Sequence, residues 1–117
     1  MPLRDFDLRE VYGEVDRVGV LSAETVGKYF LMGAEGLLAY VARNPIKIEI
    51  DVNRRGETTI TDGNHRAKAL LKHDIYVVAC EFEVVLCEPI SWSVSPIKLV
   101  DIPEVEEDEY KEYLKEF

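Results

Sequence analysis

Strict alternation of apolar and charged residues over positions 46–52 limits the folds open to this chain more than any other feature. The apolar members are Ile46, Ile48, Ile50 and Val52, and a charged residue separates each from the next. This period of two is typical of a strand with one buried face. The β-branched run 58–61 predicts a returning strand, and the polar turn around Gly56 predicts that the two strands form a hairpin.

Helical patterns flank this hairpin. Ser22 offers a side-chain oxygen to a helix N-terminus, so we expect a helix to begin near Ala23 and to bury a stripe of apolar residues at helical spacing. Gly33 and Gly36 weaken this helix and mark where it can divide into two. Pro45 ends it, because the residue before a proline is kept out of the helical conformation.

Further elements follow the hairpin. Residues 65–72 have the apolar side of a short helix, and residues 76–86 predict a long apolar strand. Near the C-terminus, tyrosines and apolar residues at helical spacing predict an amphipathic last helix, whose tyrosines make core or dimer contacts. Residues 17–21 are a candidate short strand, and one more strand is expected around Trp92 or over 97–100.

Together these elements predict an α/β (α+β) fold, in which a small mixed β-sheet is flanked by helices. A chain of 117 residues has the length of one domain. We therefore expect a single domain over 1–117. Its core spans about 22–86, and an acidic helical segment spans about 103–117.

The charge of the chain is unevenly distributed. Residues 101–117 carry eight acidic and two basic groups, which is −6 of the formal net charge of −9. Between residues 43 and 72 the sign reverses, with seven basic and four acidic residues. This stretch is either an ordinary solvated surface or a local anion site. The acidic C-terminus would be repelled by the phosphates of duplex DNA, so DNA is not an expected partner.

Composition also indicates the compartment. The longest apolar stretch is too short to span a bilayer, and the N-terminus lacks the pattern of a secretion signal. The chain has two cysteines, Cys80 and Cys87, at a spacing that does not favour a local disulfide. Neither cysteines nor histidines form a close pair of the kind found in zinc sites, so no metal site is predicted. We expect a cytoplasmic protein.

The turn at residues 62–64 carries the strongest functional signal. It joins a β-branched strand to a helix, and backbone N–H groups at a helix start have no partners within the helix. These N–H groups point beyond the end of the strand, as does the positive end of the helix dipole. Together they favour the binding of a phosphate. The side chains that could surround one polyanion are His65, Arg66, Lys68 and Lys72.

Asp62, at the end of the strand, is placed to orient a hydroxyl, a water or a metal, although an aspartate there can also simply stabilise the turn. His65 has a similar second interpretation, as a residue that caps its helix or packs in the turn. Gly63 has one as well, since a positive φ alone can require glycine.

The sequence Asp62-Gly-Asn-His-Arg66, set between a strand and a helix, resembles the glycine-histidine-arginine signature of the ParB/sulfiredoxin-like superfamily. The resemblance covers residues 22–85. It implies that Gly63, Asn64, His65 and Arg66 hold the phosphates of a nucleotide. Members include CTP-binding partition proteins, sulfiredoxins and free-amino-acid kinases that use a nucleoside diphosphate.

Two departures narrow this resemblance. Asn64 stands where sulfiredoxins carry their reactive cysteine, and no helix-turn-helix domain of a partition protein follows residue 85. The turn is most similar to that of the kinases, and that similarity implies an upstream carboxylate that accepts the substrate proton. Glu24 is the nearest candidate, and with Asp62 it completes the predicted catalytic pair.

Three functions follow from these residues. The first is a nucleotide-dependent phosphotransferase that acts on a small hydroxyl substrate, with Lys68 among the phosphate ligands and ADP, ATP or CTP as the nucleotide, with or without Mg²⁺. The second is a non-catalytic nucleotide-binding regulatory module. The third is a ParB-like nuclease or DNA-associated protein, against which the acidic charge argues.

Overall fold

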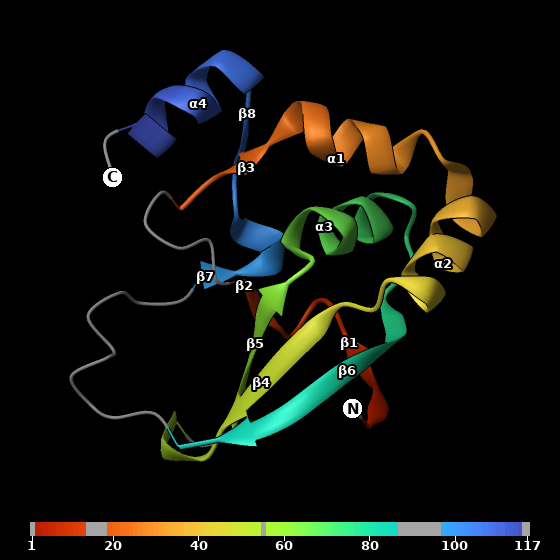
Figure 1. The fold of residues 1–117 in the computed structure, drawn as a ribbon, viewed down its shortest axis with the longest axis vertical. Coiled ribbons are helices and arrows are strands. Elements are labelled where there is room, and N and C mark those ends of the chain that lie inside the picture. The colour runs from red at the N-terminus through yellow and green to blue at the C-terminus, as the bar shows by residue number, and fades with distance from the viewer. Residues whose placement is uncertain (1, 14–18, 55, 87–96, 116–117) are drawn as a thin grey trace.

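A computed structural model of the protein describes residues 2–13, 19–54, 56–86 and 97–115 (Figure 1). The strands are β1 (Leu3–Asp7), β2 (Tyr12–Gly13), β3 (Leu21–Ser22), β4 (Lys47–Asp51), β5 (Glu57–Asp62), β6 (Val77–Val85), β7 (Ile97–Lys98) and β8 (Glu104–Val105). The helices are α1 (Ala23–Phe30), α2 (Gly33–Arg43), α3 (Asn64–Lys72), α4 (Glu107–Lys115) and the short 3₁₀ turns η1 (Val52–Arg54) and η3 (Leu99–Asp101). The predicted α+β fold is confirmed.

The main sheet has six strands in the order β1-β6-β4-β5-β2-β7, and β3 and β8 form a separate parallel pair. β4 pairs with β5 as the expected antiparallel hairpin, and it pairs in parallel with β6. In this register Ile48 lies between Ile60 and Phe82. Alternation therefore places the apolar residues of the central strands on one face.

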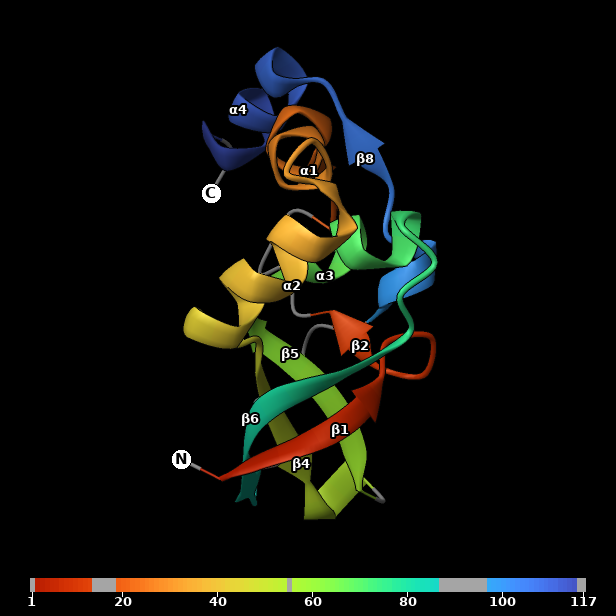
Figure 2. The ribbon, with the colours of Figure 1, turned by 90° about the vertical axis from the view of Figure 1, so that its right-hand side faces the viewer.

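The helices gather at one end of the sheet. In Figures 1 and 2, α1, α2 and α3 lie together above the end of β5, and α4 lies beside α1. α1 begins as predicted, because the Ser22 hydroxyl oxygen accepts a hydrogen bond of 3.2 Å from the Thr25 N–H. Gly33, with φ of +80°, begins α2, so the predicted division into two helices is confirmed.

The hydrophobic core lies between the helices and the sheet. Val26, Leu37 and Leu70 from the helices meet Ile48 and Ile60 from the sheet, and all five are buried. The core also includes residues outside the 22–86 stretch. These are Phe6, Leu8, Val11, Leu21, Leu99 and Ile102. Both ends of the chain thus contribute to the same core.

The N-terminal residues contain strands that the sequence did not indicate. β1 forms one edge of the sheet and pairs antiparallel with β6, and β2 lies between β5 and β7. Charged residues alternate only partly with apolar ones in β1, and β2 has two residues, so neither has a readable period.

Two predicted strands can be compared with the structure only in part. Of the candidate strand over 17–21, the structure describes residues 19–21, and there the strand β3 begins at Leu21. The strand expected around Trp92 lies outside the described residues, whereas the alternative over 97–100 is β7 followed by η3. Within the part of the chain that the structure describes, no helix has the length and apolar character needed to cross a membrane.

Candidate functional site

The turn between β5 and α3 is built around Gly63. Its φ of +105° lies in the left-handed region that favours glycine. A Cβ atom at this position would also lie 2.7 Å from Nη2 of Arg66 and 3.1 Å from Cγ1 of Ile46. The backbone angle therefore requires glycine, and a Cβ would in addition displace the Arg66 guanidinium from the turn.

Arg66 folds back over this turn. Its Nη2 lies 3.4 Å from the carbonyl oxygen of Pro45 and 3.5 Å from Oδ2 of Asp62. Only 12% of the Arg66 side chain is exposed, and its Nε is buried without a hydrogen-bond partner among the described residues. A buried donor without a partner costs free energy, so this guanidinium has unused capacity to bind an anion.

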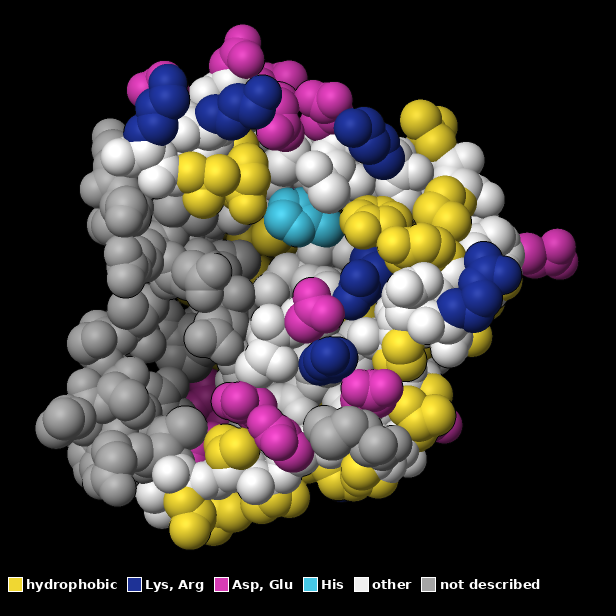
Figure 3. All heavy atoms as spheres, viewed as in Figure 1, with side chains coloured by type: hydrophobic (Ala, Val, Ile, Leu, Met, Phe, Trp, Pro, Cys, Tyr) yellow, Lys and Arg dark blue, Asp and Glu magenta, His cyan; other side chains and the backbone are white. Residues whose placement is uncertain are grey.

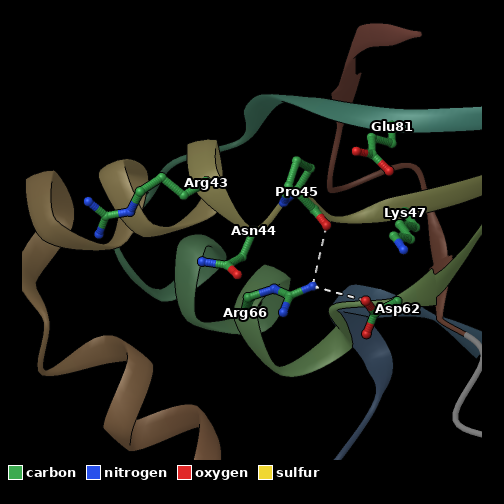
Figure 4. A pocket seen from close by; sticks show the side chains of 7 residues that line it. All are labelled: Arg43, Asn44, Pro45, Lys47, Asp62, Arg66 and Glu81. Carbon is green, nitrogen blue, oxygen red and sulfur yellow. Dashed lines mark hydrogen bonds and ion pairs between the residues drawn. The ribbon is translucent and has the colours of Figure 1, made fainter. Parts of the chain in front are cut away.

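Beside Arg66 is an open pocket of about 290 Å³ (Figure 4). We call it the Arg66 pocket, and it is lined by Arg43, Asn44, Pro45, Lys47, Asp62, Arg66 and Glu81. Figure 4 shows that these residues come from the end of α2, the start of β4, the β5–α3 turn and β6. The pocket forms where three strands meet the helices.

Opposite charges alternate across this pocket. Lys47 pairs in the sheet with Asp62 of β5 and with Glu81 of β6, so it lies in register between two carboxylates. Three cationic and two anionic side chains line the pocket. Guanidinium and ammonium groups suit phosphate oxygens, and carboxylates suit a hydroxyl proton or a hydrated Mg²⁺. The described residues contain no group of three or more His, Cys, Asp or Glu side chains suited to hold a metal without other ligands.

The structure brings Asp62, Gly63 and Arg66 together as predicted, but it directs His65 elsewhere. Nε2 of His65 accepts a hydrogen bond of 3.1 Å from the Ser22 N–H, and the His65 and Tyr110 rings pack in a T shape with their centroids 5.9 Å apart. Burial lowers the pKa of His65, opposed by the nearby carboxylates of Glu107 and Glu104. His65 thus joins α3 to the start of α1.

Lys68 and Lys72 also lie away from the Arg66 pocket. The buried ammonium of Lys68 donates to the carbonyl oxygens of Leu99 at 2.8 Å and Val100 at 3.1 Å, and burial lowers its pKa. Lys72 forms an ion pair of 2.9 Å with Glu104. The cationic face of α3 is therefore turned toward the C-terminal part of the chain.

The remaining predicted residues are also described. Glu24 is exposed on α1, pairs with Lys28 at 3.6 Å and does not line the Arg66 pocket. The side chain of Asn64 packs against β2, since a Cβ on Gly13 would lie 2.8 Å from its Oδ1. The backbone of Asn64 begins α3, which leaves the N–H groups of this first turn as the candidate phosphate ligands.

Sequence reasoning missed Arg43, Asn44, Lys47 and Glu81 as lining residues of this pocket. The local signals were the excess of basic residues over 43–72, which includes Arg43 and Lys47, and Pro45, which ends α2 and directs the chain into β4 beside the turn. Glu81 carried no such signal, because its place depends on the parallel pairing of β4 with β6.

Comparison with known proteins adds no relative: the chain matches no protein-family model, no curated protein and no solved structure. The resemblance of the turn to the ParB/sulfiredoxin-like signature stays a prediction from the motif.

Proposed function

We propose that the protein binds the phosphate groups of a nucleotide in the Arg66 pocket. The observation that carries this proposal is the state of Arg66, whose largely buried guanidinium lies beside the first turn of α3 with Nε lacking a partner. Its contact with Asp62 is long and Asp62 is 60% exposed, so solvent weakens that ion pair. A phosphate at the turn would give Arg66 a closer, charge-assisted partner.

The nearby groups extend this proposal to phosphoryl transfer. Arg43 and Lys47 offer further positive charge to a nucleotide such as ADP, ATP or CTP. Asp62, exposed at the end of β5, would accept the proton of a small hydroxyl substrate while the hydroxyl oxygen attacks the terminal phosphorus. The bond from that phosphorus to its bridging oxygen then breaks, and the nucleoside monophosphate or diphosphate leaves. Glu81 replaces Glu24 as the second carboxylate of this mechanism, because Glu81 lines the pocket.

A specific observation also favours a second function, a regulatory module that binds nucleotide without turnover. Asp62 already pairs with Arg66, the residue proposed to hold phosphate, at 3.5 Å. In a binding module this carboxylate would serve only to keep Arg66 in place until ligand arrives. The two functions share the phosphate site and differ in the role of Asp62.

Calorimetric titration of two variants tests both functions. We expect Arg66→Ala to weaken nucleotide binding about tenfold to a hundredfold, as expected for loss of a charge-assisted hydrogen bond. Arg9→Ala is the matched control, since Arg9 pairs with Asp7 and does not line the pocket. Equal binding by the wild type and both variants would contradict the proposed site.

Asp62→Asn then separates enzyme from module. For a phosphotransferase we expect this variant to keep nucleotide affinity without Mg²⁺ within a few fold and to lose turnover of the hydroxyl acceptor, measured by release of nucleoside diphosphate or monophosphate. Binding without turnover in the wild type, over a panel of small hydroxyl compounds with Mg²⁺, would leave the regulatory module as the function.

A further inference from the structure

The segment Glu104–Lys115, which we call the acidic strap, crosses the cationic face of α3. It contains six carboxylates and two lysines. Figure 1 shows it rising as β8 beside β3 and continuing as α4 next to the start of α1. In the space-filling view of the same face, acidic side chains gather around α4 (Figure 3). The strap thus carries a net charge of −4, of the −9 of the whole chain, and places the carboxylates of Glu104 and Glu107 close to α3.

Besides the pairing of β8 with β3, three side-chain contacts among the described residues join the strap to α3 and to Ser22, which caps α1. Glu104 forms the ion pair with Lys72, and the Ser22 hydroxyl donates a hydrogen bond to Glu107. Tyr110 meets the ring of His65, which lies in the first turn of α3. The last two contacts are linked, because His65 accepts the backbone N–H of Ser22.

The strap is held mainly by polar contacts, whereas the chain just before it is firmly anchored. Leu99 and Ile102 are 0% and 2% exposed and belong to the core. α4 has no buried residue within the described range. Detaching α4 therefore exposes little apolar surface and leaves the core closed, so the strap can open while the rest of the molecule stays folded.

We propose that the acidic strap is an autoinhibitory element that lowers the affinity of the phosphate site at the first turn of α3. This inference rests on the proposed function. The Glu104 and Glu107 carboxylates lie near His65, in the first turn of α3 on the side away from the Arg66 pocket, and their charge opposes the approach of a phosphate to that turn. They also place negative charge against the cationic side of α3, which reduces the positive potential that would attract a polyanion.

A matched pair of variants tests this inference. Glu107→Ala removes one negative charge and the contact with Ser22. Glu109→Ala removes the same charge from the same helix, at an exposed side chain that has no hydrogen bond or ion pair with the described residues. We expect Glu107→Ala to bind pyrophosphate about threefold to tenfold more tightly than the wild type, because the change removes a repelling charge and a contact that holds the strap. Glu109→Ala should stay within about twofold, because charge at an exposed site is screened.

Amide hydrogen exchange, measured by mass spectrometry without ligand, reports on the strap itself. We expect faster exchange in α4 of Glu107→Ala than of Glu109→Ala. Equal exchange in the two variants would overturn the role of Glu107 in holding the strap.

The two measurements keep the inference distinct from the proposed function. Faster exchange in α4 together with unchanged pyrophosphate affinity would overturn the inhibitory role and leave the phosphate site intact. Failure of all three chains to bind pyrophosphate or any nucleotide would overturn the proposed function and the inhibitory role with it.

Discussion

His65 lies where α1, α3 and the acidic strap meet, and its protonation state affects all three. To accept the Ser22 N–H, Nε2 must be unprotonated. Burial lowers the folded-state pKa below 6.5, although Glu107 and Glu104 oppose this effect. The unfolded chain therefore binds the proton more readily. Stability from this residue is complete above the unfolded-state pKa and is lost as the pH falls through it toward the folded-state value.

Urea unfolding of the wild type and His65→Gln, each at pH 7.5 and 5.5, tests this prediction. We expect the free energy of unfolding to fall more between these pH values in the wild type than in the variant. All other ionisable residues are the same in both chains, so the difference between the chains isolates His65. An equal fall in both chains would mean that His65 titrates alike in the folded and unfolded states.

At the scale of elements, the stability of α1 depends on Ser22, the residue that caps its N-terminus. The Ser22 side chain caps the helix through Thr25 and contacts Glu107, and Ser22 is fully buried. Water cannot take the place of this hydroxyl, so we expect Ser22→Ala to lower the free energy of unfolding by about 1–2 kcal/mol, the upper part of the usual range for a lost cap. Urea unfolding measures this loss, with Thr61→Ala as the control, since the Thr61 hydroxyl also donates a hydrogen bond but lies at an exposed position of β5. A loss no larger than that of the control would contradict the capping role.

Elements with a strong local pattern could be predicted from the sequence, and contacts between distant elements could not. Neighbouring residues alone determine the alternation of β4, the Ser22 cap and the turn at Gly63. The sequence predicted all three, and the structure contains them. The partners of Lys68 could not be foreseen, because the carbonyl groups of Leu99 and Val100 reach it only through the packing of η3 on α3. Helical spacing correctly put His65, Lys68 and Lys72 on one face, but spacing alone does not say what that face meets.

At the scale of the whole molecule, the reactivity of the Cys80 thiol shows whether the core is closed to solvent. It lies in β6 with no exposed surface, and burial, aided by the charge of Asp5, raises its pKa to about 12. The thiolate is the reactive form, so the native protein should protect this residue. In a Cys87→Ser variant we expect no alkylation by iodoacetamide at pH 8 on the timescale that labels the urea-unfolded variant completely, as measured by mass spectrometry. Rapid labelling without urea would reveal local opening of β6.

The position of β2 between β5 and β7 has a consequence for the order in which the chain folds. Tyr12 pairs with Thr59 on one side and with Lys98 on the other. Both partners lie far along the sequence from β2, so β2 can pair only after they have been synthesised. Non-local strand pairing slows folding, so a mixed α/β domain is expected to fold between the range of about microseconds to milliseconds typical of helical bundles and that of about milliseconds to seconds typical of all-β domains. On the ribosome, the hairpin of β4 and β5 can form early. The edge of β2 that pairs with β7 stays unpaired until β7 has left the exit tunnel.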